Sequence, residues 1–339
     1  MKEQIMADAL VEISELNKKY VLSGGFLSPQ KRIVHAVNDV DLQIFRGETL
    51  GVVGESGCGK STLARLMTRL EKPTGGSISF KGENIYDYTK EALKSYRRSV
   101  QIIFQDTYSS LNPRKSALSM IQEPLTIHRL GSAREREERA LEIMGRVGLK
   151  KEHANRYPHE FSGGQRQRIG IARAIVLRPE LIICDEPISA LDVSIQAQIV
   201  NLLSDFQKEL KLSYLFIAHD LSMVRYVSDE VGVMYLGKLV ERCTADEIYR
   251  RPLHPYTEGL LASIPIPDPR RRTLETSPGI QGDLPNPINL PEGCRFRNRC
   301  PKAMELCRSV EPVLQEVSPN HQVACHLYGA CQTGTTPEE

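Results

Sequence analysis

One stretch of eight residues, from Gly54 to Ser61, constrains the fold of this chain more than any other part of the sequence. It reads Gly-Glu-Ser-Gly-Cys-Gly-Lys-Ser and has the form G-x-x-x-x-G-K-S/T. Residues 49–53 before it are typical of a short buried strand, and one apolar helix face follows it at Leu63, Leu66, Met67 and Leu70. A strand, a glycine-rich turn and a helix start predict a phosphate-binding loop, because backbone N–H groups and the positive helix end converge there on an anion.

The residue types within this loop match that chemistry. Lys60 can reach the outer phosphates of a nucleotide, and the Ser61 hydroxyl can ligate Mg²⁺. Cys58 lies at the helix N-terminus, where a thiol pKa is lowered. It is either a reactive thiol or a small residue that fits the turn. We expect the phosphates and Mg²⁺ to be bound by Gly54, Glu55, Ser56, Gly57, Cys58, Gly59, Lys60, Ser61 and Thr62.

Polar residues also follow three later apolar runs. They are Gln105, the pair Asp185 and Glu186, and His219. Runs of this kind predict buried strands of an α/β fold, and ligands bind at such strand ends in doubly wound sheets. An acid at the end of a strand is the place for a residue that organises Mg²⁺.

The chain between these strands changes character. From residue 106 onward, charged runs and Asn-Pro or Glu-Pro pairs lie among helical periodicities, which predicts a helical insertion into the α/β domain. Near its end, Ser162, Gly163, Gly164 and Gln165 precede a strongly helical stretch. The Ser-Gly-Gly turn is a second candidate anion site by the same backbone logic.

Length and composition limit the remaining choices. The 339 residues suffice for two domains, or for one large domain with an appendage. The net charge of +2 gives no reason to expect a polyanion partner. No run of 18 apolar residues and no signal peptide are evident, so we expect a protein of the cytosol or one docked from the cytosolic side. In that compartment, clustered cysteines indicate metal ligands before disulfides.

The C-terminal quarter has a composition of its own. Twelve of the 20 prolines lie between Pro252 and Pro319, and five of the eight cysteines follow Gly293. Proline interrupts regular secondary structure. We therefore predict a boundary near residue 250, a small loop-rich module beyond it, and a disordered end from about Gln332.

Together these residues resemble the ATP-binding-cassette (ABC) family over about residues 9–245. The family's motifs occur in order: the Walker A loop 54–61, the Q-loop Gln105, the signature 162–165, the Walker B strand 181–185 with Glu186, the D-loop 189–192 and the switch residue His219. The resemblance implies an α/β P-loop NTPase with a RecA-like core, a β-rich N-terminal subdomain and a helical subdomain inserted at about 106–177. It divides the chain into an ATPase domain at 9–250 and a C-terminal module at 251–331.

The resemblance also implies a role for each motif residue. Asp185 would hold Mg²⁺ through water, Glu186 would polarise the attacking water, and His219 would contact the γ-phosphate of ATP. Gln105 would sense Mg²⁺ and the partner subunit. The signature Ser162, Gly163, Gly164 and Gln165 would clamp ATP bound by the other subunit of a head-to-tail dimer. The remaining assignments are Tyr20, where the family places an aromatic that stacks on adenine, and the D-loop residue Asp192.

The tail narrows the resemblance. Residues 251–257 and 260–265, and the segment around Cys294 and Cys300, look like the extension of dipeptide and oligopeptide importer ATPases, most like their F-type subunit. That family implies peripheral attachment to the inner or plasma membrane on its cytoplasmic side. The implied partners are a second ATPase of D-type, two permease subunits and an extracytoplasmic substrate-binding protein, with no nucleic acid. Nickel and glutathione importers share the extension and stay open, and a soluble ABC ATPase acting on nucleic acid is the more distant alternative.

Four cysteines of the tail form a candidate metal site: Cys294, Cys300, Cys307 and Cys325. The count suits an iron–sulfur cluster, a zinc ion or free thiols, and the spacing does not decide among them, although the close Cys-x₂-Cys pairs usual for structural zinc are absent from the sequence. The resemblance implies a [4Fe–4S] cluster. His321 and His326 flank the last cysteine and are either further ligands or, as we expect, solvent-exposed side chains, and we interpret Cys331 as a spare thiol.

Overall fold

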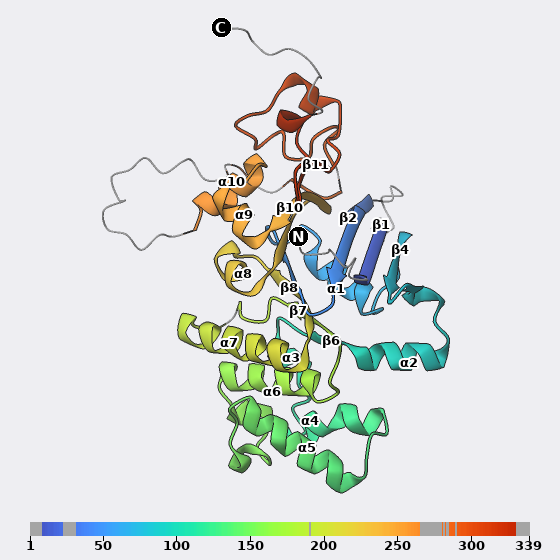
Figure 1. Cartoon of the computed structure of the whole chain (residues 1–339), viewed down its shortest axis with the longest axis vertical. Helices are drawn as coiled ribbons and strands as arrows, with labels where there is room; N and C mark the ends of the chain where they lie inside the picture. Colours follow the sequence, from blue (N-terminus) through green and yellow to red (C-terminus); the bar gives the residue numbers. More distant parts are fainter. Residues whose placement is uncertain are drawn as a thin grey trace, which may run out of the picture.

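Two β-sheets, with helices packed around them, build the computed structural model of the chain (Figure 1). The structure describes residues 9–22, 32–189, 191–264, 280, 282, 285–288 and 290–329, without the side chains of residues 107 and 108. Cys331 and the C-terminal end, for which the sequence made predictions, lie outside these residues.

The larger sheet has eight strands in the order β11-β12-β10-β9-β3-β8-β7-β6. Five neighbouring strands of this sheet, in the order β9-β3-β8-β7-β6, run parallel and are mostly buried, as expected when helices cover both faces. The other three add at one edge in antiparallel pairs. The strands are β3 (Thr49–Val53), β6 (Val100–Ile103), β7 (Leu181–Asp185), β8 (Ser213–Ala218), β9 (Glu230–Tyr235), β10 (Lys238–Thr244), β11 (Gln315–Ser318) and β12 (His321–Val323).

The smaller sheet is antiparallel, with the order β2-β1-β4-β5. Its strands are β1 (Ala9–Leu22), β2 (Arg32–Phe45), β4 (Gly75–Phe80) and β5 (Glu83–Asn84). Helix α1 (Lys60–Met67) packs between the two sheets, where Leu63, Leu66 and Met67 join one buried core with residues of both. The phosphate loop therefore lies at the junction of the two sheets.

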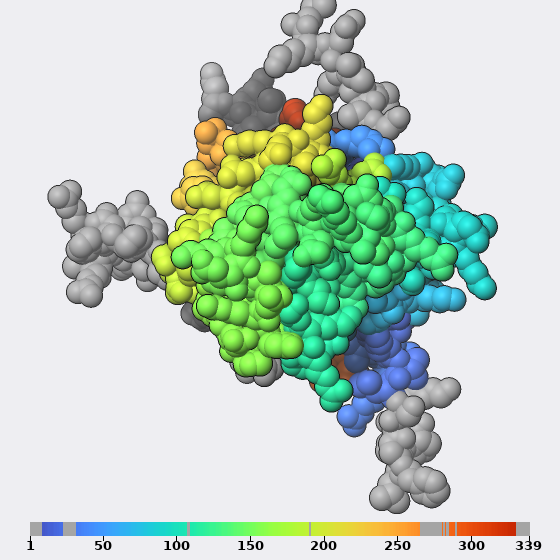
Figure 2. Space-filling view, turned by 90° about the horizontal axis from the view of Figure 1, so that it is seen from below, coloured from blue at the N-terminus to red at the C-terminus, as the bar shows by residue number. Residues whose placement is uncertain are grey.

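The helices between β6 and β7 form one end of the molecule. They are α3 (Thr107–Ser110), α4 (Ala117–Ile127), α5 (Ala133–Arg146) and α6 (Gly163–Ile175), with the 3₁₀ turns η2 (Lys151–His153) and η3 (Pro158–Glu160). Figure 2 views the molecule from that end and shows these helices covering most of the near face. The apolar side of α5 packs inward through Ala140, Ile143 and Met144, while its charged run faces solvent.

The remaining helices flank the larger sheet and the C-terminal part. They are α2 (Lys90–Ser99), α7 (Val193–Leu210), α8 (Leu221–Val227), α9 (Ala245–Arg250) and α10 (Pro255–Ala262), with the 3₁₀ turns η1 (Ile85–Asp87), η5 (Glu305–Arg308) and η6 (His326–Tyr328). Among the residues described, no helix combines the length and the apolar character needed to cross a bilayer.

The C-terminal part joins the rest of the larger sheet through both backbone and side chains. Strand β12 pairs with β10, and Phe296 and Tyr256 belong to the large buried cluster beneath the parallel strands. His321 is buried, with 1% of its surface exposed, and its Nε2 lies 2.8 Å from the Glu241 carboxylate. Our interpretation of His321 as solvent-exposed is therefore wrong, because a buried carboxylate on the adjacent strand provides its partner. The domain boundary near residue 250 stays a prediction.

Two local expectations also differ from the structure, and one helix was not predicted. Helix α1 ends at Met67, because Arg69 takes a left-handed backbone conformation, and this leaves Leu70 61% exposed instead of on the buried face. Helix α2 was not predicted from apolar periodicity, because Tyr96 alone of its residues is buried. Helix α10 forms within the proline-rich tail, because Pro255 occupies its first turn, where no N–H partner is needed.

Candidate active site

The phosphate loop is held in a shape that requires glycine at two positions. Gly54 and Gly59 have φ angles of +155° and +112°. A Cβ atom on Gly54 would lie 2.2 Å from the backbone oxygen of Met234, and one on Gly59 would lie 2.2 Å from that of Ala36. Strands β9 and β2 therefore leave room for backbone alone at these two positions of the loop.

Lys60 supplies the positive charge of the loop from a buried position. Its side chain belongs to a residue that is 3% exposed, and its Nζ donates to the backbone oxygens of Gly54 at 2.6 Å and Glu55 at 3.1 Å. The ammonium group is thus folded across the loop that surrounds it. Ammonium and loop amides together form a site for the phosphates of a nucleotide.

Two oxygen donors meet beside the loop. Ser61 Oγ donates to Asp185 Oδ1 at 3.0 Å, and Asp185 ends strand β7. Burial raises the pKa of Asp185, the Ser61 hydrogen bond lowers it, and the neighbouring Glu186 raises it again. A hydroxyl and a buried carboxylate side by side fit Mg²⁺, which takes oxygen ligands.

Glu186, Gln105 and His219 gather from the ends of three adjacent parallel strands. Gln105 Nε2 donates to Glu186 Oε2 at 2.6 Å, and His219 Nδ1 lies 3.7 Å from the same oxygen. Glu186 has a φ of +47°, a left-handed conformation that costs a non-glycine residue about 1–3 kcal/mol. The carboxylate is thus turned toward a hollow of about 580 Å³.

The Ser-Gly-Gly turn borders the same hollow. Ser162 caps α6: its Oγ accepts from the Gln165 N–H, and the Gln165 side chain accepts from the Ser162 N–H at 3.1 Å. Gly163 lines the hollow, and a Cβ on Gly164 would come within 2.7 Å of Ile195. The start of α6 is therefore an exposed, rigidly capped helix N-terminus near Glu186.

Two predicted site residues have local partners of their own. The Tyr20 hydroxyl donates to Glu71, and the ammonium of Lys18 lies 4.8 Å from the Tyr20 ring centroid. Asp192 caps α7, accepting from the Ile195 N–H at 3.0 Å. The structure thus places Tyr20 on β1, in contact with Glu71 just after α1. It places Asp192 at the start of α7, where its side chain caps the helix.

Comparisons with known proteins agree with this geometry. The family model "ABC transporter" matches residues 37–189, and the model "Oligopeptide/dipeptide transporter, C-terminal region" matches residues 240–307. The oligopeptide transport ATP-binding protein AppF of Bacillus subtilis is 52% identical over 95% of this chain and 98% of its own length. The dipeptide transport ATP-binding protein DppF of Escherichia coli is 48% identical over 96% of each chain.

The chain belongs to the ABC transporter family of ATPases. Its fold resembles that of the ATP-binding cassette MJ0796, solved as a dimer bound to ADP and Pi, with a TM-score of 0.62, 30% identity and coverage of 69% of this chain and 98% of the other. The expectation of an ABC-type α/β ATPase is confirmed. The structure also brings Lys60, Ser61, Asp185, Glu186 and Gln105 of this ABC ATPase to one region, as their order in the sequence predicted.

For Cys58 of the ABC phosphate loop, the structure favours one of the two alternatives that the sequence left open. Cys58 is 1% exposed, and burial raises the pKa of its thiol although Lys60 opposes the shift. Sequence reasoning placed Cys58 at a helix N-terminus, where a thiol is activated. The side chain instead points into the core, where desolvation outweighs the nearby positive charge. This burial favours the alternative in which Cys58 is a small residue that fits the turn.

The four C-terminal cysteines lie near one another in this ABC ATPase. The Cys294 N–H donates to the Cys307 backbone oxygen at 2.9 Å, and Cys307 is buried. Burial raises the pKa of Cys294 to about 11, and the other three thiols add to the rise. Burial likewise raises the pKa of Cys300 and Cys325. Three of the four thiols thus lie where losing a proton requires a compensating charge.

Sequence reasoning missed two residues at the phosphate loop. Tyr256 accepts a hydrogen bond from the Glu55 N–H at 2.8 Å, and Arg299 forms an ion pair with the Glu55 carboxylate. Both lie more than two hundred residues along the chain from Glu55, at separations of 201 and 244. No spacing or periodicity relates them to the loop, so only the folded structure reveals the contact.

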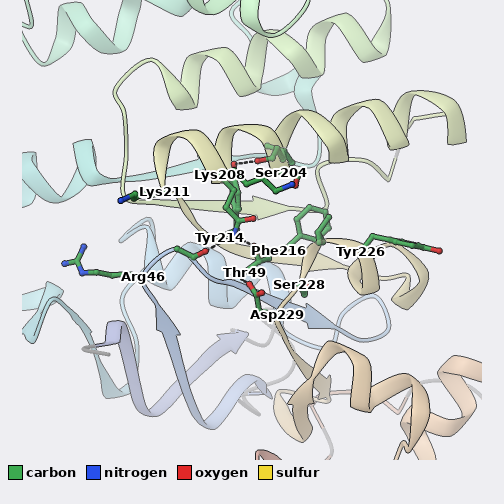
Figure 3. A pocket seen from close by; sticks show the side chains of 14 residues that line it. Arg46, Thr49, Ser204, Lys208, Lys211, Tyr214, Phe216, Tyr226, Ser228 and Asp229 are labelled. Carbon is green, nitrogen blue, oxygen red and sulfur yellow. Dashed lines mark hydrogen bonds between the residues drawn. The ribbon is translucent and has the colours of Figure 1, made fainter. Parts of the chain in front are cut away.

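Another hollow, of about 690 Å³, lies at the opposite ends of β3 and β8. Figure 3 shows Lys208 and Lys211 at its rim, Tyr226 at the other side and Asp229 below. Thr49 donates its N–H to Asp229 there at 2.8 Å. The amino ends of parallel strands are not where ligands of doubly wound sheets bind, so we assign this hollow no role in nucleotide chemistry.

Proposed function

We propose that this ABC ATPase powers the uptake of dipeptides or oligopeptides through a membrane importer. The observation that carries the proposal is its similarity, at 48–52% identity along nearly the whole chain, to peptide-transport ATP-binding proteins. The match to the oligopeptide/dipeptide C-terminal region extends that similarity beyond the ATPase motifs that all ABC proteins share.

The assembly that follows has several partners. We assign the chain the place of the F-type subunit, since the relatives AppF, DppF and OppF bear that letter. It would pair with a D-type ATPase and dock on two permease subunits that receive peptide from an extracytoplasmic binding protein. Its place is then the cytoplasmic side of the membrane, as a peripheral subunit.

In this proposal the site residues divide the work of ATP hydrolysis. The phosphate loop and Lys60 hold the phosphates, and Ser61 and Asp185 hold Mg²⁺, which neutralises charge on the phosphates when bound. Glu186 polarises the attacking water, and His219 and Gln105 position that carboxylate. Tyr20 would stack on the adenine, and the exposed signature turn from Ser162 to Gln165 would close on ATP of the partner subunit.

Peptide uptake by living cells tests the proposed substrate. A strain lacking this subunit should take up a radiolabelled tripeptide poorly, and the wild-type gene should restore uptake. The Lys60→Ala variant, produced at the same level, should not restore it. Uptake of the tripeptide at the wild-type rate without the subunit would contradict the peptide proposal, and loss of nickel or glutathione uptake in that strain would favour those alternatives.

We also propose that Cys294, Cys300, Cys307 and Cys325 hold a [4Fe–4S] cluster. One zinc ion with sulfurs at about 2.3 Å would bring them all close together. Yet among the described residues no three of these Sγ atoms lie within 4.8 Å of one another. The group that meets this distance consists of one possible ligand atom each from Glu241, Cys243 and His321. Four more widely spaced thiolates would suit a four-iron cluster, whose positive charge would offset the cost of deprotonating one buried and three partly buried thiols.

Metal content tests the cluster. Protein purified without oxygen should be brown and contain roughly four iron and four sulfide per chain. Replacing Cys300 and Cys307 with serine should remove the colour, while Cys243→Ser, outside the four, should keep it. One equivalent of zinc with no iron in protein never exposed to oxygen would refute the cluster.

A further inference from the structure

The C-terminal segment reaches the phosphate loop through Arg299. The guanidinium contacts both carboxylate oxygens of Glu55, with Nη1 to Oε2 at 2.6 Å and Nη2 to Oε1 at 2.9 Å. The Arg299 side chain is 6% exposed and that of Glu55 28%. A two-pronged pair with so little exposure is stronger and more directional than an ordinary surface ion pair.

A second contact holds the backbone of the same residue. The Glu55 N–H donates to the hydroxyl oxygen of Tyr256 at 2.8 Å. Tyr256 is fully buried, and its ring packs against Tyr235 and Phe296, with centroids 4.7 Å and 5.4 Å away. Phe296 lies three residues before Arg299, so one aromatic cluster supports both contacts.

Glu55 in turn touches the catalytic lysine. Lys60 Nζ donates to the Glu55 backbone oxygen at 3.1 Å. The position of Glu55 therefore affects both the path of the loop backbone and the seat of the ammonium group that binds phosphate. A shift of Glu55 would misplace amides that must converge on an anion.

We propose that Arg299 is a positioning residue for the phosphate loop, through which the C-terminal segment sets the ATP affinity of its own chain. Arg299 acts through Glu55 and does not itself touch the nucleotide. The inference concerns ATP binding, so it goes beyond the proposed transport function and holds for any transported substrate. It gives the C-terminal segment a role in the nucleotide site, in addition to any metal it binds.

Arg295 offers a matched control within the same loop. Its Nε pairs with Glu311 at 2.9 Å, its side chain is 11% exposed, and its Nη1 donates to the backbone oxygen of Leu236. Arg295→Ala thus removes another arginine–glutamate pair of the same segment, whose partners are Glu311 and Leu236 instead of Glu55. It separates positioning of the loop from general loosening of the C-terminal segment.

Binding of MgATP to the full-length protein, measured by calorimetry, tests the proposal. We expect Arg299→Ala to weaken binding about tenfold, the effect of losing one charge-assisted contact. Arg299→Lys, which keeps the charge but not the fork, should recover part of the affinity. Arg295→Ala should bind ATP as the wild type does. In the assembled transporter, Arg299→Ala should raise KM for ATP and leave kcat at saturating ATP unchanged.

A double variant completes the test. Glu55→Gln removes the ion pair from the loop side, and combining it with Arg299→Ala should weaken binding no further than either change alone. If Arg299→Ala fails to fold, Glu55→Gln must by itself weaken ATP binding about tenfold. The proposal is overturned if folded Arg299→Ala binds MgATP within twofold of wild type, or if Arg295→Ala weakens binding equally.

Discussion

At the scale of single residues, the role that we propose for Glu186 in ATP hydrolysis rests on the surroundings of its carboxylate. Gln105 and His219 face the same oxygen of that carboxylate. Asp185, one residue earlier, is engaged by Ser61 instead. Two neighbouring acids thus have different partners, which fits one for holding Mg²⁺ and the other for directing water.

Replacing Glu186 with glutamine should abolish steady-state ATP hydrolysis, by about 100-fold or more, while MgATP still binds. The substitution removes the charge that polarises water but keeps the size of the side chain and leaves Asp185 intact. Phosphate release by the assembled transporter and ATP retention on a filter measure the two effects. Glu180→Gln is the control, because Glu180 precedes the same strand and pairs with Arg46 and Lys81.

To exclude turnover by the second ATPase subunit that we propose, the corresponding glutamate of that subunit is replaced in both samples. Phosphate release at the wild-type rate from such a complex would contradict the role of Glu186.

At the scale of secondary-structure elements, one buried carboxylate joins three segments. Glu241 on β10 is 0% exposed and accepts from the N–H groups of Leu253 at 2.7 Å and His254 at 3.0 Å. It also pairs with His321 on β12. Each of these donors would lack a partner without the carboxylate, so the three segments depend on one side chain.

Glu241→Ala should therefore destabilise the protein by about 3–5 kcal/mol, as removal of one partner from a buried charged group does. Strand β12 should detach from β10 first, because it pairs with β10 at only two positions, Gln322 and Val323. Urea denaturation and limited proteolysis of residues 290–329 measure the two effects. Glu230→Ala is the control, since Glu230 on β9 forms a partly exposed pair with Arg242 and should cost less than about 1 kcal/mol. Equal losses in the two variants would contradict the role of Glu241.

At the scale of the whole molecule, the larger sheet ties the C-terminal part to the ATPase core, and a buried histidine lies at that junction. His254 is 2% exposed, and its Nδ1 accepts from the Tyr256 N–H at 3.0 Å. Burial lowers the pKa of His254 from its ordinary value of 6.5 to about 4, against a smaller raising effect of Glu241. The folded chain thus keeps this imidazole neutral while the unfolded chain protonates it.

As the pH falls, the unfolded chain binds this proton before the folded chain does. The contribution of neutral His254 to the free energy of unfolding is therefore complete above pH 6.5 and is lost as the pH falls toward 4. Between pH 7 and pH 5 the loss should be about 2 kcal/mol. His254→Asn keeps a hydrogen-bond acceptor for the Tyr256 N–H but does not titrate. The free energy of unfolding of both proteins is measured in urea at pH 7 and pH 5. From pH 7 to pH 5 the wild type should lose about 2 kcal/mol more than this variant does. A difference independent of pH would show that His254 does not titrate on unfolding.

The sequence determined the parts of this protein whose physics is local. Gly54, Gly59 and Lys60 follow from the needs of backbone and charge at an anion site, and Asp185, Glu186 and His219 follow from their positions after apolar strands. Parallel strands place their carboxyl ends along one edge of the sheet, so order in the chain predicted proximity in space.

Only the tertiary structure decided the properties that depend on neighbours distant in sequence. Packing buries the thiol of Cys58, which favours a small residue that fits the turn over a reactive thiol, and His321 is a buried partner because β12 lies against Glu241. Arg299 meets Glu55 across 244 residues, a contact that no local pattern encodes. Burial and pairing are set by which surfaces meet after folding, and desolvation then outweighs the local charge that the sequence displays.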